Sequence, residues 1–151
     1  MDGFEDIKKE LRALKLENAR LRKKLEENDQ VSDEYPMSLE EYKRYGRQMI
    51  VEGTDGIKGQ IKLRNAKVLV VGAGGLGCPV LPYLAGAGVG KIGIVDNDVV
   101  DTSNLHRQVL HDTTKVGMLK CESAKQVLNK LNPHVEVVTY PVRLDGKNAF
   151  G

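Results

Sequence analysis

A glycine-rich turn that joins an apolar run to a helical segment is the strongest constraint in this sequence. The run at residues 67–71, KVLVV, is of the β-branched type found in buried strands, and GAGGLG follows it at residues 72–77. Glycine permits a tight turn and lets backbone N–H groups approach a phosphate, which the N-terminus of a following helix also attracts. The pattern predicts a nucleotide-binding turn. Its contacts would come from Gly72, Gly74, Gly75 and Gly77.

Strand and helix patterns alternate after this turn. A helix is expected over about residues 76–87, a strand over 91–96, a helix over about 117–131 and a strand over 135–140. Such alternation is typical of parallel strands joined by right-handed helical crossovers. We therefore predict an α/β fold, the N-terminal half of a doubly wound parallel sheet of the Rossmann type.

Two shorter helices are predicted before the first strand. Ser38 followed by Glu41 forms a capping box, which marks the start of one helix. Thr54 or Asp55 is expected to cap a second helix that ends near Leu63.

The first 29 residues have a different composition, rich in Leu, Lys, Arg and Glu and without proline. Their apolar residues recur at spacings of three and four, as in the seam of a coiled coil. The a positions would be Phe4, Leu11, Asn18 and Leu25, and the d positions Ile7, Leu14 and Leu21. The g and e′ positions of a parallel homodimer would pair Glu10 with Lys15, Glu17 with Arg22 and Lys24 with Asp29. We predict a two-stranded coil whose register is fixed by Asn18.

Two other interpretations of this segment remain. One is a single solvated amphipathic helix, because about three heptads are marginal for a coil. The other is a basic-zipper DNA reader, which the interleaved Glu residues and the lack of a continuous basic region disfavour. The sequence is thus divided into a coiled-coil helix at 1–29, a polar linker at 30–37 and a sheet domain at 38–151.

An acidic residue at the end of the second predicted strand extends the nucleotide-binding pattern. Asp96 lies about 20 residues beyond the glycine-rich turn, where a carboxylate accepts hydrogen bonds from ribose hydroxyls. Glycines that serve only the packing of helix on strand would not account for an acid at this distance. A nicotinamide dehydrogenase has the same fingerprint and is the competing class.

The polar segment after Asp96 favours an ATP-splitting enzyme over that competitor. It places Asn104, Arg107 and Gln108 just beyond the predicted ribose acid. A dinucleotide needs no cation there, because its pyrophosphate lies on the first helix. ATP chemistry needs donors for the outer phosphates and for charge that develops in the transition state.

These motifs resemble those of the MoeB/ThiF branch of the ubiquitin-activating enzymes. The resemblance rests on the strand–GxGGxG–helix unit, the strand-end Asp96, SNLHRQ at 103–108 and Lys120 before ESA, and it covers roughly residues 38–140. Within the branch, the chain is most similar to the eukaryotic adenylyltransferases and sulfurtransferases that act on the ubiquitin-related modifier and on molybdopterin synthase.

The resemblance implies a role for each matching residue. Gly75 would lie against the nucleotide phosphates, Asp96 would hold the ribose, and Arg47 would reach into the site of the other subunit of a homodimer. The residues expected at the phosphate end of the site are Ser103, Asn104, Leu105, His106, Arg107 and Lys120. The predicted catalytic residues are Arg107, Lys120 and Arg47, and no metal ligand is predicted within the chain.

Each assignment has a structural alternative. Arg107 and Lys120 could be surface charges, and Arg47 could simply pair with a helix. His106 is interpreted as a local packing or hydrogen-bonding residue. Cys78 lies at a helix start, where the dipole would lower the thiol pKa, but a packed small residue is the simpler interpretation.

Charge and cysteine usage restrict the partners. A net charge of +2, from 23 basic and 21 acidic residues, predicts no direct binding to nucleic acid. No segment has the pattern of a signal peptide or a membrane span, so no membrane partner is expected. Two cysteines without CxxC spacing argue against a zinc site or a disulfide framework here and favour a reducing, cytoplasmic location.

The function implied by the resemblance is ATP-dependent adenylation of the C-terminal glycine of a ubiquitin-like sulfur-carrier protein, for tRNA thiolation and molybdenum-cofactor synthesis. ATP and Mg²⁺ are the expected cofactors. The family's Mg-binding Asp, zinc-binding cysteines, catalytic cysteine and rhodanese domain would follow Gly151, so we expect a truncated adenylation domain. The alternative is a nucleotide-binding and dimerisation fragment without turnover of its own.

Overall fold

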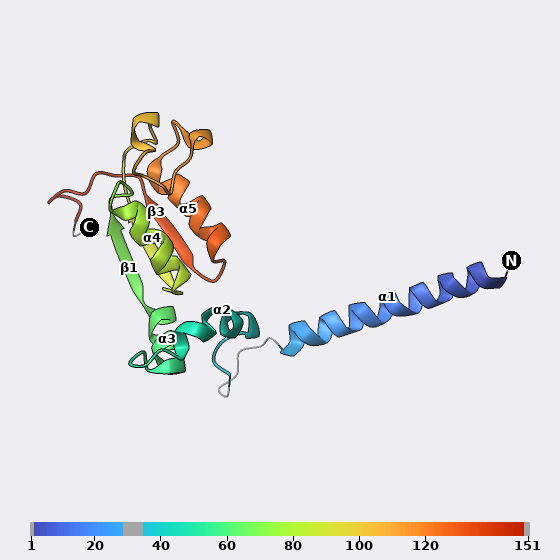
Figure 1. The fold of residues 1–151 in the computed structure, drawn as a ribbon. Helices are drawn as coiled ribbons and strands as arrows, with labels where there is room; N and C mark the ends of the chain where they lie inside the picture. The colour runs from blue at the N-terminus through green and yellow to red at the C-terminus, as the bar shows by residue number, and fades with distance from the viewer. Residues whose placement is uncertain (1, 29–34, 150–151) are drawn as a thin grey trace. The chain divides into compact units, whose positions relative to one another are not determined.

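The computed structural model describes residues 2–28 and 35–149 and places them in two compact units (Figure 1). The first unit reaches Lys43 and the second begins at Arg44. Residues 30–34 of the predicted linker, and Asp29 at the end of the predicted coil, lie outside the described residues. The predicted nucleotide-binding motifs all belong to the second unit.

The first unit contains helix α1, Asp2–Asn28, which is 27 residues long. The structure describes four side chains of its predicted seam, and all four are exposed: Leu11, Leu14, Asn18 and Leu21. The seam side chains of Phe4, Ile7 and Leu25 lie outside the described ones. The predicted helix is confirmed, whereas its pairing into a coil stays a prediction.

Helix α2, Leu39–Met49, starts with the predicted capping box. The Glu41 N–H donates to the Ser38 hydroxyl oxygen at 3.3 Å, and the Ser38 N–H donates to Glu41 Oε2 at 2.9 Å. These reciprocal bonds satisfy amides that the first turn of a helix otherwise leaves without partners. The box therefore fixes where α2 begins.

Helix α3, Gly56–Asn65, begins where expected but without the expected cap. Asp55 holds the cap position with a left-handed φ of 58°, and its carboxylate pairs with Lys62 at 2.7 Å. The Thr54 hydroxyl donates backward to the Val51 carbonyl at 2.7 Å. Asp55 therefore occupies the predicted cap position, but neither side chain makes a cap hydrogen bond, because both have other partners.

The second unit contains a three-stranded parallel sheet in the order β1-β2-β3. The strands are β1 Lys67–Val71, β2 Lys91–Val95 and β3 Glu136–Tyr140. Helix α4, Gly77–Gly86, connects the first two strands, and helix α5, Lys120–Leu131, precedes the third. The predicted parallel, Rossmann-like α/β arrangement is confirmed. A doubly wound sheet, with helices on both faces, stays a prediction.

The core of this unit lies between the sheet and the two crossover helices. Ile92 and Ile94 of β2 belong to one buried cluster with Leu81 of α4 and Leu128 of α5, and all four side chains are fully buried. Burying a side chain of this size stabilises a fold by about 1.5–3 kcal/mol. This layer fixes the strands relative to the helices. It therefore determines the position of the carboxyl ends of the strands.

Strand β1 is less buried than its sequence predicts. Leu69 and Val71 expose 57% and 58% of their surfaces, whereas Val68 and Val70 pack against the core. Alternate residues of a strand point to opposite faces, and β1 is an edge strand of the described sheet. The prediction of a buried strand was therefore wrong for one of its two faces.

A polar loop with two 3₁₀ turns, η1 Thr102–Asn104 and η2 Thr113–Lys115, connects β2 to α5. Val99 and Leu119 form an antiparallel bridge across this loop. Helix α5 starts later than the predicted residue 117, because Gly117 takes a left-handed φ of 87°. The bridge brings the start of α5 next to the residues that follow β2.

Candidate functional site

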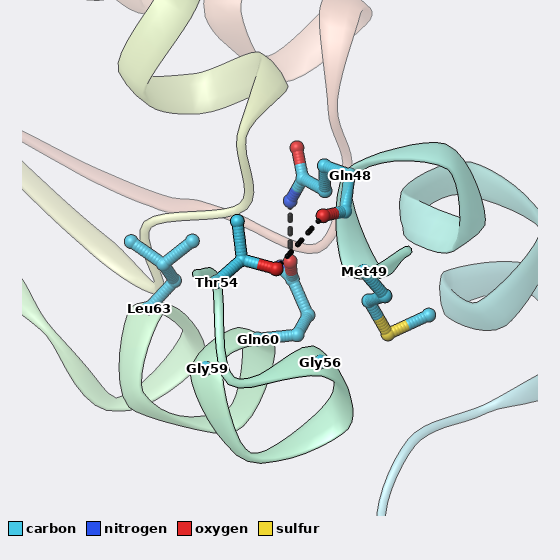
Figure 2. Close-up of a pocket in the computed structure, with 7 residues that line it drawn as sticks. All are labelled: Gln48, Met49, Thr54, Gly56, Gly59, Gln60 and Leu63. Atoms are coloured by element: carbon cyan, nitrogen blue, oxygen red, sulfur yellow. Dashed lines mark hydrogen bonds between the residues drawn. The ribbon is translucent and has the colours of Figure 1, made fainter. Parts of the chain in front are cut away.

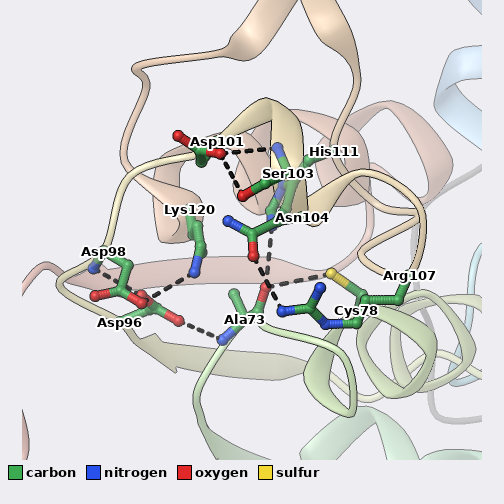
Figure 3. Close-up of polar contacts among 10 residues, drawn as sticks. All are labelled: Ala73, Cys78, Asp96, Asp98, Asp101, Ser103, Asn104, Arg107, His111 and Lys120. Atoms are coloured by element: carbon green, nitrogen blue, oxygen red, sulfur yellow. Dashed lines mark hydrogen bonds and ion pairs between the residues drawn. The ribbon is translucent and has the colours of Figure 1, made fainter.

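Asp96 follows directly after β2, at the carboxyl edge of the sheet (Figure 3). Its Oδ2 accepts a hydrogen bond from the Ala73 N–H of the glycine-rich turn at 2.7 Å, and its Oδ1 accepts one from the Asp98 N–H at 2.8 Å. Each carboxylate oxygen can accept a further hydrogen bond. The carboxylate is therefore held in place and can still receive donors such as ribose hydroxyls.

The middle of the glycine-rich turn is open. A Cβ placed on Gly74 would come within 3.7 Å of Gln108 Nε2, and one on Gly75 within 3.8 Å of Arg107 Cδ. Both neighbours are long side chains that lie over the turn. Backbone N–H groups at this place can approach an anion closely, as phosphate binding at a helix N-terminus requires.

Gly72 and Gly77 shape the turn itself. Gly72 has a φ of 94°, which residues with a side chain rarely adopt. A Cβ on Gly77 would lie 1.9 Å from the Gly72 carbonyl oxygen. Because Gly77 is the first residue of α4, this close contact sets the start of the helix against the end of β1. Contact of these two glycines with a nucleotide stays a prediction.

Arg107 belongs to the loop after β2, and its side chain is exposed. Its Nη2 donates to Asn104 Oδ1 at 3.1 Å, and its Nη1 lies 3.2 Å from His106 Nε2. Asp101 holds the same loop, because its Oδ1 accepts from the Ser103 hydroxyl and N–H at 2.5 and 2.8 Å. These hydrogen bonds from Ser103 keep the pKa of the Asp101 carboxyl below its ordinary value. The guanidinium has five N–H donors, so it is positioned by its neighbours and can still bind an anion.

Lys120 is the first residue of α5 and is only 5% exposed. Its Nζ donates to Asp98 Oδ2 at 3.0 Å, and its backbone N–H donates to the Asp98 carbonyl at 2.9 Å. An ammonium has three donors, so Lys120 can contact an anion without leaving Asp98. The interpretation of Lys120 as a mere surface charge is therefore wrong.

The structure brings most of the predicted site residues to the carboxyl edge of β1 and β2 and to the loop beyond it. These residues are Gly72, Gly74, Gly75, Gly77, Asp96, Ser103, Asn104, Leu105, His106, Arg107 and Lys120. Their contacts with a nucleotide stay predictions. His106 makes the local contact with Arg107 that its interpretation requires.

Arg47 is not part of this group. In α2, Arg44 Nη1 donates to the Leu131 carbonyl at 3.0 Å, and Gln48 Nε2 donates to the Ala87 carbonyl at 2.8 Å. Leu131 ends α5 and Ala87 follows α4, so this part of α2 lies where the crossover helices end (Figure 1). The glycine-rich turn lies where α4 begins, at the carboxyl ends of the strands, whereas the ends of α4 and α5 lie near the amino ends of the strands.

Three further residues lie at the candidate site, and two of them, Asp98 and His111, had no predicted role. Asp98 holds Lys120, and His111 contacts the glycine-rich turn. Gln108 is 4% exposed, and its Oε1 is buried without a hydrogen-bond partner among the described residues. The alternation Asp96-Asn-Asp98 could have identified Asp98 as a site residue. The burial of His111 could not be predicted in this way, because it depends on elements far apart in the sequence.

Cys78 agrees with the simpler of its two interpretations. The side chain is fully buried, and its Sγ donates to the Ala73 carbonyl at 3.2 Å. Burial raises the pKa of the thiol. The expected lowering by the helix dipole was wrong, because removing a thiolate from water outweighs it. Cys121 is also fully buried in the core.

A separate hollow of about 370 Å³ lies beside α2 and α3 (Figure 2). It is lined by Gln48, Met49, Thr54, Gly56, Gly59, Gln60 and Leu63. Gln48 Nε2 donates to Gln60 Oε1 within it. Because none of the lining side chains ionises near neutral pH, the hollow has no charge with which to bind a phosphate.

Among residues 2–28 and 35–149, no group of three or more His, Cys, Asp or Glu side chains could hold a metal ion. Within the same part of the chain, no helix has both the length and the apolar character that crossing a bilayer requires.

Comparison with known sequences gives the following relatives. A profile of the ThiF family matches residues 45–150. The adenylyltransferase and sulfurtransferase UBA4 of Saccharomyces cerevisiae is 73% identical over 147 residues, which are 97% of this chain and 33% of that protein. The protein of the same name from Kluyveromyces lactis is 69% identical over 148 residues, with the same two coverages of 97% and 33%. The chain thus spans about a third of the length of the curated relatives it matches.

Two similar solved structures contain ATP. Escherichia coli MccB with ATP has a TM-score of 0.64 and 37% identity, over 68% of this chain and 32% of that chain. Escherichia coli TcdA, a tRNA N6-threonylcarbamoyladenosine dehydratase, in complex with ATP has a TM-score of 0.67 and 27% identity, over 79% of this chain and 45% of that chain. The fold described above is therefore shared with proteins that bind ATP.

Proposed function

The chain belongs to the ThiF family, and from that premise we propose that the intact protein uses ATP to adenylate the C-terminal glycine of a ubiquitin-like sulfur-carrier protein. Relatives named adenylyltransferase and sulfurtransferase support this proposal. The adenylated carrier would then receive sulfur for tRNA thiolation and molybdenum-cofactor synthesis, in the cytoplasm.

One observation carries the proposal: a fixed carboxylate and two cations lie around a single glycine-rich turn. Asp96 is bonded to the turn through the Ala73 N–H at 2.7 Å. Arg107 lies over Gly75, and Lys120 is held at Asp98. An acceptor for ribose hydroxyls and separate donors for outer phosphates fit a nucleoside triphosphate.

The proposed reaction needs positioning and charge stabilisation from these residues. A carboxylate oxygen of the carrier's C-terminal glycine attacks the α-phosphorus of ATP and forms an acyl phosphate bond. The bond from the α-phosphorus to the bridging oxygen breaks, and pyrophosphate leaves with the electron pair. Arg107 and Lys120 stabilise the charge that develops on the phosphate oxygens, while Asp96 holds the ribose. Mg²⁺ would accompany ATP, and zinc would bind elsewhere in the intact protein.

Carrier-dependent exchange of pyrophosphate into ATP tests this function in the intact protein. We expect exchange only when the carrier ends in its free glycine carboxylate, because that group is the nucleophile. A carrier that lacks the terminal glycine is the matched control. Exchange that ignores the carrier would contradict the proposed substrate.

A calorimetric titration separates this function from that of a nicotinamide dehydrogenase. We expect ATP to bind and NAD to bind more weakly, because Arg107 and Lys120 provide charge beyond the ribose site. Equal or tighter binding of NAD would reject the proposal.

We also propose that the protein works as a homodimer in which Arg47 acts in the site of the other subunit. Arg44 and Gln48, which flank Arg47, bond to residues at the far ends of α5 and α4. That position supports a role outside the subunit's own site. The exposed leucines of α1 support a parallel coil as a second contact between the subunits.

Mixing two inactive variants tests the shared site. A heterodimer of Arg47→Ala and Arg107→Ala subunits has one site with both arginines if Arg47 acts across the dimer. About half of the activity of a wild-type dimer should then return, since one of two sites is intact. If Arg47 acts within its own subunit, the mixture stays inactive even though heterodimers form.

A second candidate function is a nucleotide-binding and dimerisation module without turnover. The glycine-rich turn of the sheet unit and the exposed leucines of α1 are the features that support it. The two candidates differ in one measurement. A module binds ATP but gives no carrier-dependent exchange, whereas the adenylating enzyme gives both.

A further inference from the structure

His111 is buried between the glycine-rich turn and α5, and the proposed reaction does not use it (Figure 3). Its Nε2 lies 3.0 Å from the Ala73 carbonyl oxygen, and its Nδ1 lies 2.9 Å from the Ser123 hydroxyl oxygen. Ser123 belongs to the first turn of α5. The imidazole therefore bridges the turn to the helix that begins with Lys120.

These two partners select one tautomer of the ring. A carbonyl oxygen can only accept, so Nε2 carries the hydrogen and donates to Ala73. In a neutral ring Nδ1 is then unprotonated and accepts from the Ser123 hydroxyl. Both polar atoms of this buried side chain are satisfied while it stays uncharged.

The backbone at Ala73 is held at both of its polar groups. Its N–H donates to Asp96 Oδ2 at 2.7 Å, and its carbonyl accepts from His111 Nε2 and from Cys78 Sγ at 3.2 Å. Gly74 follows directly in the chain. The direction of the peptide N–H of Gly74 therefore depends on the carbonyl that His111 binds, since the two belong to one planar peptide group.

The other end of the bridge acts on α5. Ser123 is fully buried and lies one helical turn after Lys120. Loss of the two His111 hydrogen bonds would therefore remove this link between the glycine-rich turn and the start of α5.

We propose that His111 is a positioning residue for nucleotide binding. It locks the glycine-rich turn to the first turn of α5 and so sets the spacing between the turn and Lys120. This inference rests on the proposed function, since it concerns the same ATP site.

Burial favours the neutral ring at this position. Burial lowers the pKa of His111 below its ordinary value of 6.5, and the hydrogen bond to Ala73 opposes that effect. The charges of Lys120 and Lys115 lower the pKa further, whereas Asp96 raises it. The other titratable neighbour is Cys78, which shares the Ala73 carbonyl and whose raised pKa keeps it uncharged.

The direction of the pH effect follows from this lowered pKa. The unfolded chain takes up the proton first as the pH falls, so the contribution of His111 to stability is complete above about pH 6.5. It is lost as the pH falls through the lower pKa of the folded state. Affinity for ATP should weaken as the folded ring takes up a proton, because a buried positive charge close to Lys120 destabilises the contact between the turn and α5.

Two substitutions in the full-length protein test the lock at neutral pH. His111→Gln keeps an N–H donor near the place of Nε2, and its affinity for ATP in calorimetry should stay within about twofold of wild type. His111→Phe keeps a ring but no donor, and its affinity should fall about tenfold, as expected for one lost buried hydrogen bond. In pyrophosphate exchange, the KM for ATP of His111→Phe should rise by a similar factor, with a smaller change in kcat.

The pH profile separates a lock from a merely structural residue. The ratio of wild-type to His111→Gln affinity should fall as the pH drops through the lowered pKa of the folded His111, because only the wild-type ring takes up a proton. Titration of ATP itself cancels in this ratio. A ratio that does not change with pH would contradict the role of the neutral ring.

Val135→Ala is the control for lost stability. Val135 is a core residue just before β3, at the amino end of that strand, whereas the glycine-rich turn lies at the carboxyl ends of the strands. The substitution should lower the unfolding temperature and leave ATP affinity unchanged. If His111→Phe binds ATP as tightly as wild type, or if Val135→Ala weakens binding equally, the lock is rejected.

Ser123→Ala tests the lock in a second way if His111→Phe does not fold. It removes the partner of Nδ1 and keeps the donor to Ala73, so the KM for ATP should rise about threefold. An unchanged KM rejects the lock. Failure of the wild-type protein to bind ATP would reject the proposed function itself, whereas wild-type binding with unaffected variants rejects only this inference.

Discussion

In α1, Leu11, Leu14 and Leu21 expose 51%, 51% and 52% of their surfaces, whereas Leu81 and Leu128 of the sheet unit expose none. The same residue type thus serves two different purposes. In the sheet unit, leucine side chains fill a core that strands and helices of one chain complete. In α1, Leu11, Leu14 and Leu21 form a stripe that this core does not include.

The difference shows where each region obtains its stability. A core cluster stabilises the sheet unit and holds the glycine-rich turn in place. Most of the stability of a helix in a protein comes from packing its apolar face, so α1 would gain stability from a partner that covers its leucines. The sheet unit therefore completes its own core, whereas the described leucine side chains of α1 remain exposed.

The largest expected effect concerns the turn at the start of α4. Gly77→Ala places a Cβ 1.9 Å from the Gly72 carbonyl oxygen, so the turn must open. We expect a loss of about 3 kcal/mol or more in the free energy of unfolding, and loss of measurable ATP binding. Chemical denaturation and calorimetry measure the two effects.

Gly86→Ala is the matched control on the same helix. Gly86 is the last residue of α4, and a Cβ there has no atom within 4 Å. Alanine favours helix more than glycine does, so stability should stay or rise slightly. Equal damage from both substitutions would contradict the special role of the turn.

The second prediction removes charge from the site without touching the core. Arg107→Ala in the intact protein should lower the rate of pyrophosphate exchange by two orders of magnitude or more, about 2.7 kcal/mol in the transition state. The unfolding temperature should change little, because Arg107 is exposed in a polar loop. A variant that loses stability and activity together would place Arg107 in the fold and not in the chemistry.

The third prediction weakens ribose binding. Asp96→Ala should reduce ATP affinity by roughly 1 to 3 kcal/mol, because the ribose hydroxyls lose a charged acceptor. The Ala73 N–H also loses its partner, so the turn should become less protected in hydrogen exchange. Asp55→Ala, which removes an exposed carboxylate that pairs with Lys62, should leave ATP affinity unchanged.

Local sequence signals predicted the elements that depend on local chemistry. The β-branched runs predicted all three described strands, and the pair Ser38 and Glu41 predicted the start of α2. The spacing between the glycine-rich turn and Asp96 predicted that they meet. Each of these signals lies within one short segment or follows from the geometry of a parallel sheet.

The errors concern features that tertiary contacts decide. Asp55 occupies the N-cap position of α3, but its side chain pairs with Lys62 and makes no cap hydrogen bond. The exposed face of β1 depends on which helices cover the sheet. The pairing of Lys120 with Asp98, and the burial of His111 between two elements, join segments that no sequence period connects. Sequence alone therefore predicted which residue types the site needs, but not the contacts that hold them.

The last prediction concerns α1, where the expected effect on the nucleotide site is smallest. Asn18→Leu replaces the polar residue of the predicted seam with an apolar one in a helix whose Asn18 side chain is exposed. In a parallel coil this change should raise the unfolding temperature of the α1 pair and broaden the distribution of oligomers, because the amide no longer selects one register. Sedimentation of the intact protein measures the oligomers, and ATP affinity should not change.

Cross-linking decides between a coil and a single helix. Two copies of Leu14→Cys should form a disulfide efficiently in a parallel coil, since both would occupy the same d position. Leu16→Cys is the matched control, because Leu16 lies outside the seam and exposes 79% of its surface. Equal cross-linking at both positions, or none at Leu14, would reject the parallel coil. In that case the leucine stripe of α1 would require a partner other than a second copy in parallel register.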